Sequence, residues 1–258
     1  MTSRYRISVG GVELDSLDDR LLILDIGYSA PERETRKYST ANLDGIDIKE
    51  TKVIRRTVTV TFELHVYGIA ERNALCQAVN AWAAAGGTLI TNDREGQRLV
   101  NVVCSQFAEI DSARDWTSPL TIVFETTYVP YWVSDEEVVR TLTGKNTTGI
   151  MALDGNTGEA LVSVTATAQS AVTSFKATVG DKALVLTGLS VATGQTIVID
   201  YIRNRYLRIR ANGVNVQGKL VPAESSDNLT AECGKTSQIG IVSDGRVTAV
   251  FKARGCWR

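Results

Sequence analysis

The side chains that most often carry acid–base or metal chemistry are few and widely spaced in this sequence. His65 is the single histidine among 258 residues, which excludes multi-histidine metal sites and two-histidine mechanisms. One imidazole can still serve a Ser-His or Cys-His pair, but no Gly-x-Ser-x-Gly elbow or cysteine signature accompanies it. His65 also lies on the polar face of an alternating segment. We therefore interpret it as a solvated strand residue.

Three pairs of carboxylates are close neighbours in the sequence: Asp18 with Asp19, Asp44 with Asp47, and Glu136 with Glu137. Glycosidase chemistry needs two carboxylates on opposite sides of a sugar bond, usually contributed by distant strands. These pairs lie in polar, loop-like stretches, which favours solvated turn acids. Neither the dinucleotide-binding nor the phosphate-binding glycine motif occurs. We predict no catalytic residue, no metal site and no cofactor.

One basic cluster alternates with aromatic residues in the segment YIRNRYLRIR, which contains Tyr201, Arg203, Arg205, Tyr206, Arg208 and Arg210. Interleaved aromatic and basic side chains can form a platform for nucleic acid or glycan. The same spacing is typical of one exposed strand face, with Arg208 and Arg210 pointing away from Leu207 and Ile209. We favour the strand face, and the sequence leaves both interpretations open.

The four cysteines, Cys76, Cys104, Cys233 and Cys256, are scattered and form no Cys-x-x-Cys motif. We expect reduced thiols, two of them buried, with Cys256 the first to react. The start of the sequence lacks the apolar core of a signal peptide, and no apolar run is long enough to span a bilayer. A formal net charge of −1 argues against a dedicated nucleic-acid binder.

Hydrophobic periodicity predicts the elements of the first half. A period of two over residues 57–67 predicts a strand that buries Val58, Val60, Phe62, Leu64 and Val66. From about Ile69 to Ala84 a helical stripe is followed by Gly86-Gly87, which predicts one helix with Leu75, Cys76, Val79, Trp82 and Ala83 on its apolar face. Further alternating segments follow up to about Pro130.

The composition changes between residues 134 and 149, where an acidic stretch gives way to Gly, Asn and Thr. We predict a linker there, with a domain boundary near residue 143. The remainder consists of short alternating segments separated by turns, of which Asn212-Gly213 predicts a two-residue type I′ hairpin. The expected fold is mainly β with one helix, an α+β domain over 1–143 and an all-β sandwich over 144–258.

The order of these features resembles the phage distal tail protein (Dit) family over nearly the whole chain. In the first half the resemblance rests on Leu43-Asp44-Gly45, on Arg55-Arg56 before TVTVTFELHVY, on ERNALCQAVNAWAAAGG with TLITNDREGQRL, and on IVFETTYVPYW. In the second half it rests on Gly155-Asn156-Thr157-Gly158, on GQTIVIDYIRNRYLRIRANG and on ARGCWR.

The resemblance implies a structural virion protein of a long non-contractile phage tail, not an enzyme, assembled in the host cytoplasm. Residues 1–143 would form a homo-hexameric ring that joins tail tube to tail tip, and residues 144–258 a peripheral galectin-like sandwich. Implied partners are the tail tube protein and tail-tip, tail-associated lysin or receptor-binding proteins. DNA would pass through the ring without specific binding, and no membrane is implied. The chain shows no long arm on the sandwich, which argues against a host-binding appendage.

A second interpretation, from a different class, is a carbohydrate-binding β-sandwich module of a phage tail or cell-surface protein. Sugar sites of this kind need a polar cluster beside an aromatic platform. The second half offers few aromatic residues, namely Phe175, Tyr201, Tyr206, Phe251 and Trp257. The structural virion role is therefore the function that the sequence favours.

Overall fold

The computed structural model describes residues 4–38, 47–110, 119–156 and 158–257. The chain divides into two compact units, Met1–Trp132 and Val133–Trp257. Each unit has its own core.

The first unit is built on one antiparallel sheet, which we call the main sheet. Its strands lie in the order β2-β1-β7-β8-β9-β6-β3, as paired by register. They are β1 (Ile7–Val9), β2 (Val12–Glu13), β3 (Leu21–Tyr28), β6 (Thr57–Leu64), β7 (Gly87–Thr91), β8 (Gln97–Gln106) and β9 (Leu120–Thr126), with a 3-10 helix at Leu14–Ser16.

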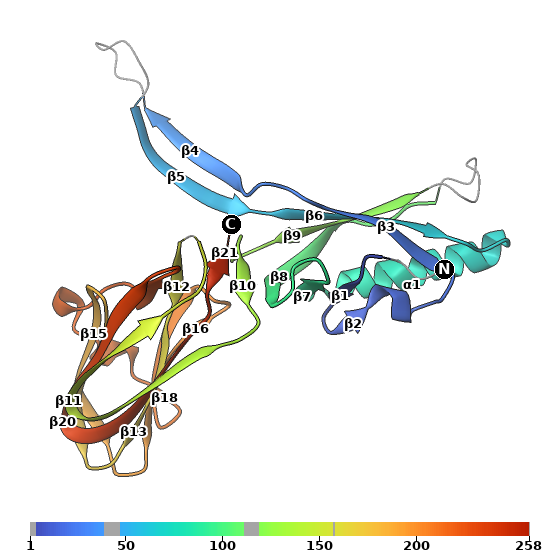
Figure 1. Ribbon diagram of the computed structural model, residues 1–258. Coiled ribbons are helices and arrows are strands. Elements are labelled where there is room, and N and C mark those ends of the chain that lie inside the picture. The colour runs from blue at the N-terminus through green and yellow to red at the C-terminus, as the bar shows by residue number, and fades with distance from the viewer. Residues whose placement is uncertain (1–3, 39–46, 111–118, 157, 258) are drawn as a thin grey trace. The chain divides into compact units, whose positions relative to one another are not determined.

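The sequence pattern explains why the main sheet forms. Burial along β6 alternates strictly, with Val58, Val60, Phe62 and Leu64 inside, so the predicted strand is confirmed. The single α-helix of the described residues, α1 (Ile69–Ala85), also lies where the sequence predicts it, and it buries the predicted apolar stripe. It runs alongside the strands of the main sheet in Figure 1.

Two contacts hold α1 to the main sheet. The indole of Trp82 packs edge-on against Phe124 of β9, with ring centroids 5.7 Å apart, and its Nε1 donates to the carbonyl of Val12 at 2.8 Å. The helix ends at Gly86, whose φ is +57° and where an added Cβ would lie 2.7 Å from the carbonyl oxygen of Val102. Only glycine fits that turn without displacing β8.

A separate two-stranded hairpin interrupts the sequence between β3 and β6. Its strands are β4 (Glu32–Tyr38) and β5 (Asp47–Arg55), which pair antiparallel with each other. Figure 1 shows them extending from the end of the β3–β6 pair, beyond the strands that α1 covers. The sequence does not predict this hairpin, because its residues lack an alternation of apolar and polar side chains.

The second unit is a β-sandwich. Its long strands are β11 (Val138–Ala152) and β20 (Thr236–Ala253), with β13 (Ser163–Ala168), β14 (Val172–Val179), β15 (Lys182–Val191), β16 (Thr196–Ile202) and β17 (Tyr206–Ala211) completing most of the sheet. Shorter strands are β10 (Trp132–Ser134), β12 (Glu159–Leu161), β18 (Val214–Asn215), β19 (Thr230–Glu232) and β21 (Cys256–Trp257), with 3-10 helices at Gln217–Lys219 and Pro222–Glu224.

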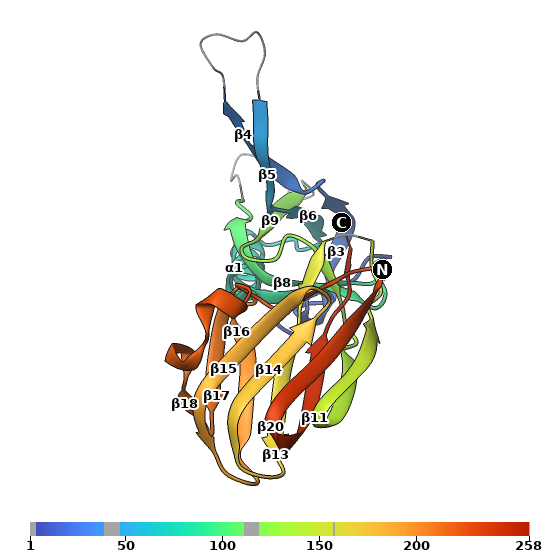
Figure 2. The same ribbon diagram turned by 90° about the vertical axis from the view of Figure 1, so that its left-hand side faces the viewer.

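The sheet of the sandwich curls because β20 serves two neighbours. Its first half pairs with β14 and its second half with β13, while β11 follows its whole length. Figure 2 shows β20 between β14 and β11. The turn of direction falls at Gly245, and β11 carries a register irregularity between Gly144 and Asn146. Inside lie large side chains that are at most 1% exposed, among them Phe175, Leu184, Ile199, Ile239 and Phe251. The predicted class, mainly β with one helix, is confirmed.

The structure differs from the sequence analysis over residues 134–149, which were expected to be a linker. Most of this stretch belongs to β11, and the division between the units falls at Trp132–Val133 instead of near residue 143. The composition misled because β11 is an exposed strand, in which only Leu142 and Met151 are buried. The Asn212-Gly213 turn does join β17 to β18, with φ of +47° and +82°, as a type I′ hairpin requires.

Candidate interaction surfaces

The residues that the sequence analysis weighed for chemistry lie apart in the structure. His65 follows β6, has a side chain 47% exposed and stands 3.4 Å from Glu63. Asp18 accepts hydrogen bonds from the guanidinium and the backbone N–H of Arg20. These bonds hold the pKa of the Asp18 carboxyl well below its usual range. Asp18 is therefore the anchor of a turn and holds no proton to donate at neutral pH.

The other two acid pairs are dispersed as well. Glu137 pairs with Lys252 across the β11–β20 ladder at 3.3 Å. Asp44, with the Leu43-Asp44-Gly45 stretch, lies outside the described residues, and Asp47 begins β5. Across the described part of the chain, no group of three or more His, Cys, Asp or Glu side chains is placed to hold a metal ion. No helix there is long and apolar enough to cross a membrane.

The arginine-rich segment 201–210 forms the β16–β17 hairpin, where two of its arginines are neutralised. Asp200 stands opposite Arg208 in the register, accepts two hydrogen bonds from it at 2.7 and 2.6 Å, and accepts one from Arg210 at 3.0 Å. The bonds from Arg208 lower the pKa of Asp200. The strand-face interpretation of Arg208 and Arg210 fits this ladder, and the nearby Asp200 was the signal that the sequence analysis overlooked.

The tip of the same hairpin is different. Arg203 and Asn204 both have φ above +50°, which an arginine adopts rarely. Beside them Ile202 and Tyr206 are 45% and 54% exposed, and the guanidinium of Arg205 lies 5.5 Å from the Tyr206 ring. The tip thus presents an apolar and basic surface on the second unit.

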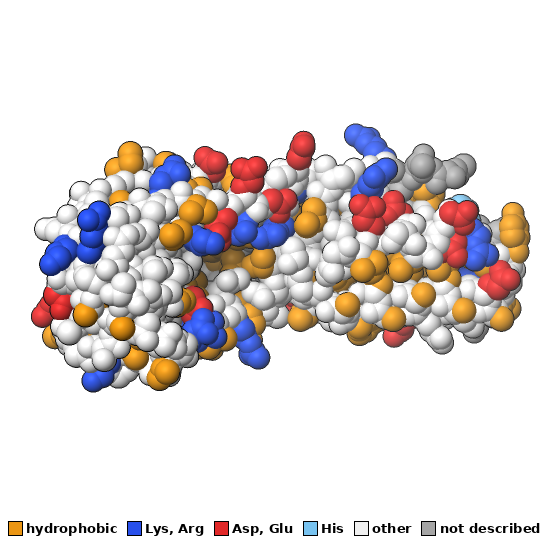
Figure 3. Space-filling model, turned by 90° about the horizontal axis from the view of Figure 1, so that it is seen from below, with side chains coloured by type: hydrophobic (Ala, Val, Ile, Leu, Met, Phe, Trp, Pro, Cys, Tyr) orange, Lys and Arg blue, Asp and Glu red, His pale blue; other side chains and the backbone are white. Residues whose placement is uncertain are grey.

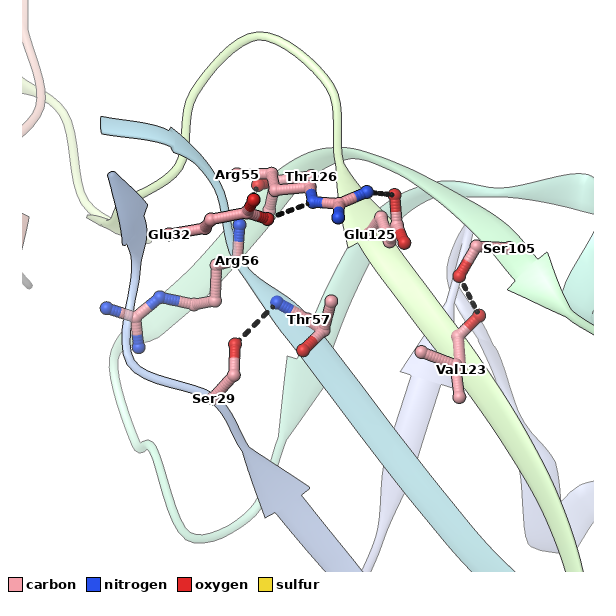
Figure 4. A network of polar contacts seen from close by, with 9 residues as sticks. All are labelled: Ser29, Glu32, Arg55, Arg56, Thr57, Ser105, Val123, Glu125 and Thr126. Atoms are coloured by element: carbon pink, nitrogen blue, oxygen red, sulfur yellow. Dashed lines mark hydrogen bonds and ion pairs between the residues drawn. The ribbon is translucent and has the colours of Figure 1, made fainter. Parts of the chain in front are cut away.

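In the first unit, the hairpin of β4 and β5 is fastened to the main sheet at its base. Arg55, the last residue of β5, bridges Glu32 of β4 and Glu125 of β9, the latter at 3.1 Å. Close by, the backbone N–H of Thr57 donates to Ser29 Oγ at 2.9 Å. Figure 4 shows these side chains meeting where β4 and β5 leave the sheet. Charged residues thus fix the direction in which the hairpin starts.

Arg56 belongs to the same junction but points elsewhere. Its backbone N–H donates to Thr126 Oγ1 at 2.9 Å, and in Figure 4 its guanidinium extends away from the Glu32–Arg55–Glu125 bridge. Only 4% of Arg56 is exposed, and its Nε donates a hydrogen bond to the carbonyl of Pro130 at 3.4 Å. Burial lowers the pKa of Arg56, and the charge of Arg94 adds to the effect. Arg94 in turn stacks on Tyr28 and Trp132, 5.2 Å from each ring centroid.

Beyond its base, the hairpin pairs only with itself among the described residues. Its described side chains, Glu32–Thr35 and Val53–Arg55, include none that is buried. An isolated two-stranded ribbon is marginally stable in water. The hairpin is therefore a segment suited to contact a second protein surface.

The main sheet also offers open edges and exposed apolar residues. Within the described residues β3 pairs on one side only, with β6, which leaves backbone groups available for another strand. At the start of α1, Tyr67 and Ile69 are 87% and 78% exposed. On the face shown in Figure 3, acidic and basic side chains are interspersed and no large patch of one sign appears.

Comparison with known proteins gives the context for these surfaces. No family model matches the sequence, and no curated protein matches it. Among solved structures, the chain is similar to the Dit protein of phage SPP1, a paradigm of the hub adsorption apparatus in phages that infect Gram-positive bacteria. The TM-score is 0.72 at 14% identity, over 97% of this chain and 98% of that one.

The chain is also similar to a component of the phage P2 baseplate in its activated conformation. The TM-score is 0.50 for the baseplate with Ca, at 12% identity, and 0.50 for the baseplate with Sr, at 11% identity. In both, 97% of each chain is covered. The resemblance to the Dit family that the sequence predicts is thus confirmed as a likeness of fold. The chain has the fold of a phage distal tail protein across both of its units.

Proposed function

We propose that this chain is a structural virion protein of a long non-contractile phage tail, where it joins the tail tube to the tail tip. The observation that carries the proposal is the match to the SPP1 Dit protein over 97% of this chain. The match therefore includes the first unit as well as the β-sandwich of the second unit.

The subunits form a homo-hexameric ring, to which the first unit contributes the contacts. Two features support this assignment. The hairpin of β4 and β5 has no described partner beyond its base, and β3 leaves one edge of the main sheet open. Ring subunits that meet head to tail need two different complementary surfaces, and the first unit offers two.

The second unit lies at the periphery of the ring as a galectin-like sandwich and meets tail-tip, lysin or receptor-binding proteins. DNA passes through the ring without specific contacts, because the net charge of −1 and the interspersed charges in Figure 3 provide no strong positive field. A carbohydrate-binding role has less support, because Arg208 and Arg210 of the basic cluster form ion pairs with Asp200.

Light scattering of the purified protein tests the proposal. We expect a mass of about six times 28.0 kDa in the presence of the tail tube protein, and six-fold end-on views by negative-stain microscopy. A strict monomer in the presence of tube and tip proteins would contradict it.

A further inference from the structure

Two buried thiols meet in the second unit, although the whole of β20 separates them in the sequence. Cys233 follows β19 and is 8% exposed, and Cys256 begins β21 and is 5% exposed. The two side chains are close enough to shift each other's pKa, and Cys256 Sγ donates to the carbonyl of Arg254 at 3.8 Å. The expectation that Cys256 is the first thiol to react is wrong, because its side chain is buried although it lies near the end of the sequence. All four cysteines are free thiols in the structure.

Backbone contacts around Gly155 hold the two cysteines in place. Gly155 forms a bridge with Cys256, and the backbone N–H of Asn156 donates to the carbonyl of Cys256 at 3.0 Å. On the other side, the backbone N–H of Cys233 donates to the carbonyl of Gly158 at 3.1 Å.

Gly155 itself shows how close the two cysteines come. An added Cβ there would lie 2.9 Å from both Cys233 Cβ and the Cys256 nitrogen, and would collide with the Cys256 carbonyl. The φ of Gly155 is +130°, which also favours glycine. The convergence of the thiols is thus set by three backbone segments and does not depend on a flexible rotamer.

The thiols are chemically unequal. The neighbouring thiol of Cys256 lowers the pKa of Cys233, whereas the neighbouring Cys233 together with burial raises the pKa of Cys256. A thiolate is the nucleophile of disulfide exchange. Cys233 is therefore the attacking sulfur and Cys256 the resolving one.

The two cysteines of the first unit are placed differently. Cys76 Sγ donates to the carbonyl of Ala108 at 3.6 Å, and Cys104 Sγ donates to the carbonyl of Gln106 at 3.2 Å. Burial raises the pKa of both thiols. Neither has a described hydrogen bond to another sulfur, which makes them internal controls.

We propose that Cys233 and Cys256 are an oxidation site that closes to an intramolecular disulfide when the protein meets a low-molecular-weight disulfide. The Cys233 thiolate attacks one sulfur of the small disulfide, forms a mixed disulfide and releases one small thiolate. Cys256 then loses its proton, attacks the Cys233 sulfur and expels the second small thiolate. Two protein thiols are oxidised by two electrons, the small disulfide is reduced to two thiols, and those thiols take up the protons.

The bond would join the end of β19 to β21 across β20, and so tie the last strand to the sandwich. Such a bond does not form in a reducing cytoplasm and persists outside it. If the proposed virion role holds, the disulfide therefore forms in the second unit after release from the host. The chemistry itself does not depend on that role.

The test uses the full chain, purified with a reductant, desalted and then incubated with glutathione disulfide. We expect a mass loss of about 2 Da, since two hydrogens leave, and a Cys233–Cys256 peptide after digestion. Thiol titration in denaturant should fall from four thiols to two, with Cys76 and Cys104 still free. The melting temperature of the oxidised chain should rise by about 5 °C or more.

Cys233→Ser and Cys256→Ser should each abolish the mass loss and the rise in melting temperature, and Cys104→Ser should preserve both. Peptide mapping of the wild-type chain keeps the test valid where a serine variant fails to fold. Stable glutathione adducts without ring closure, a bond that involves Cys76 or Cys104, or four thiols after exposure would each overturn the proposal. Oligomeric mass, measured on the same samples, reports separately on the ring.

Discussion

Two strand pairs of this molecule have similar hydrogen-bond pairing but differ in how many neighbouring strands and buried side chains stabilise them. The pair of β4 and β5 and the pair of β11 and β20 are both long, antiparallel and rich in polar residues. In the second pair, β20 also bonds to β13 and β14 and buries every second side chain along much of its length. In the first pair, neither strand has another described neighbour.

The difference teaches that hydrogen-bond pairing alone does not make a strand pair a stable part of a fold. Net stabilisation by one backbone hydrogen bond is small, whereas each large side chain buried along β20 contributes about 1.5–3 kcal/mol. The β11–β20 pair is therefore structural within one subunit. Under the proposed function, the β4–β5 pair would obtain comparable burial from another subunit.

The largest expected effect follows from truncating the core under β20. Phe251 is 0% exposed, and Phe251→Ala should lower the free energy of unfolding by about 3–5 kcal/mol through lost burial and a cavity. Urea denaturation of the purified chain measures this. Ile150→Ala on β11, where the side chain is 66% exposed, serves as the control and should cost less than about 0.5 kcal/mol. Equal losses in the two variants would refute the comparison.

A smaller effect is expected at the bend of β20. An added Cβ on Gly245 would collide with the carbonyl oxygen of Ala171 and lie 2.8 Å from Val172 Cγ2. Gly245→Ala should therefore cost about 1–3 kcal/mol, because backbone must move to relieve the overlap. Gly218→Ala has open space around the new methyl group and should be neutral. Urea denaturation of both variants measures the difference. A neutral Gly245→Ala would show that the bend is looser than the contacts indicate.

The sequence predicts those parts of the fold in which one face is buried. The alternation that buries Val58 to Leu64 in β6 and the stripe of α1 both follow from the apolar pattern, since burial selects for it. The type I′ turn at Asn212-Gly213 follows from local backbone preference. Each of these depends on interactions inside one subunit.

The sequence does not predict the parts that are exposed in the single subunit. The hairpin of β4 and β5 and the strand β11 carry polar residues on both faces, so their pattern is that of a loop. The proposed assembly surface includes the hairpin of β4 and β5. Both elements escape prediction because neither shows the alternation of apolar residues that burial produces. The Asp200 ladder had a signal, since Asp200 lies close to Arg208 and Arg210 in the sequence, but their contact depends on the register of the hairpin.

Removal of the bridge at the base of the hairpin tests whether β4 and β5 serve assembly. Arg55→Ala deletes the ion pairs to Glu32 and Glu125, but Arg55 is 46% exposed, so the free energy of unfolding should change by less than about 1 kcal/mol. The oligomeric mass by light scattering should fall all the same, because the hairpin loses its direction.

Arg20→Ala is the matched control for this variant. Arg20 is also 46% exposed and also bridges two carboxylates, those of Asp18 and Glu71. It should cost a similar small amount of stability and leave the oligomeric mass unchanged. Assembly that survives Arg55→Ala and Arg20→Ala alike would remove the hairpin base from the ring contacts.

The smallest effect is a pH dependence at the bend of β20. The Asp244 carboxylate accepts hydrogen bonds from the hydroxyl of Thr173 and from the backbone N–H groups of Thr173, Ser174 and Gly245, which lower its pKa to about 2. The pKa of an aspartate in the unfolded chain is about 3.9. Because the folded pKa is the lower one, the stabilisation is complete above the unfolded value and is lost as the pH falls from about 4 to about 2.

The side chain of Asp244 is exposed, so water screens these bonds and the gain should stay below about 1 kcal/mol. Asp244→Asn should therefore lower the melting temperature slightly at pH 7 and reduce the loss of stability of the wild-type chain between pH 4 and pH 2. Glu137→Gln, which removes a carboxylate from the β11 side of the same strand pair, controls for the change in charge. An acid-unfolding curve of Asp244→Asn that superimposes on the wild-type curve would show that the bend is held by packing around Gly245 rather than by this carboxylate.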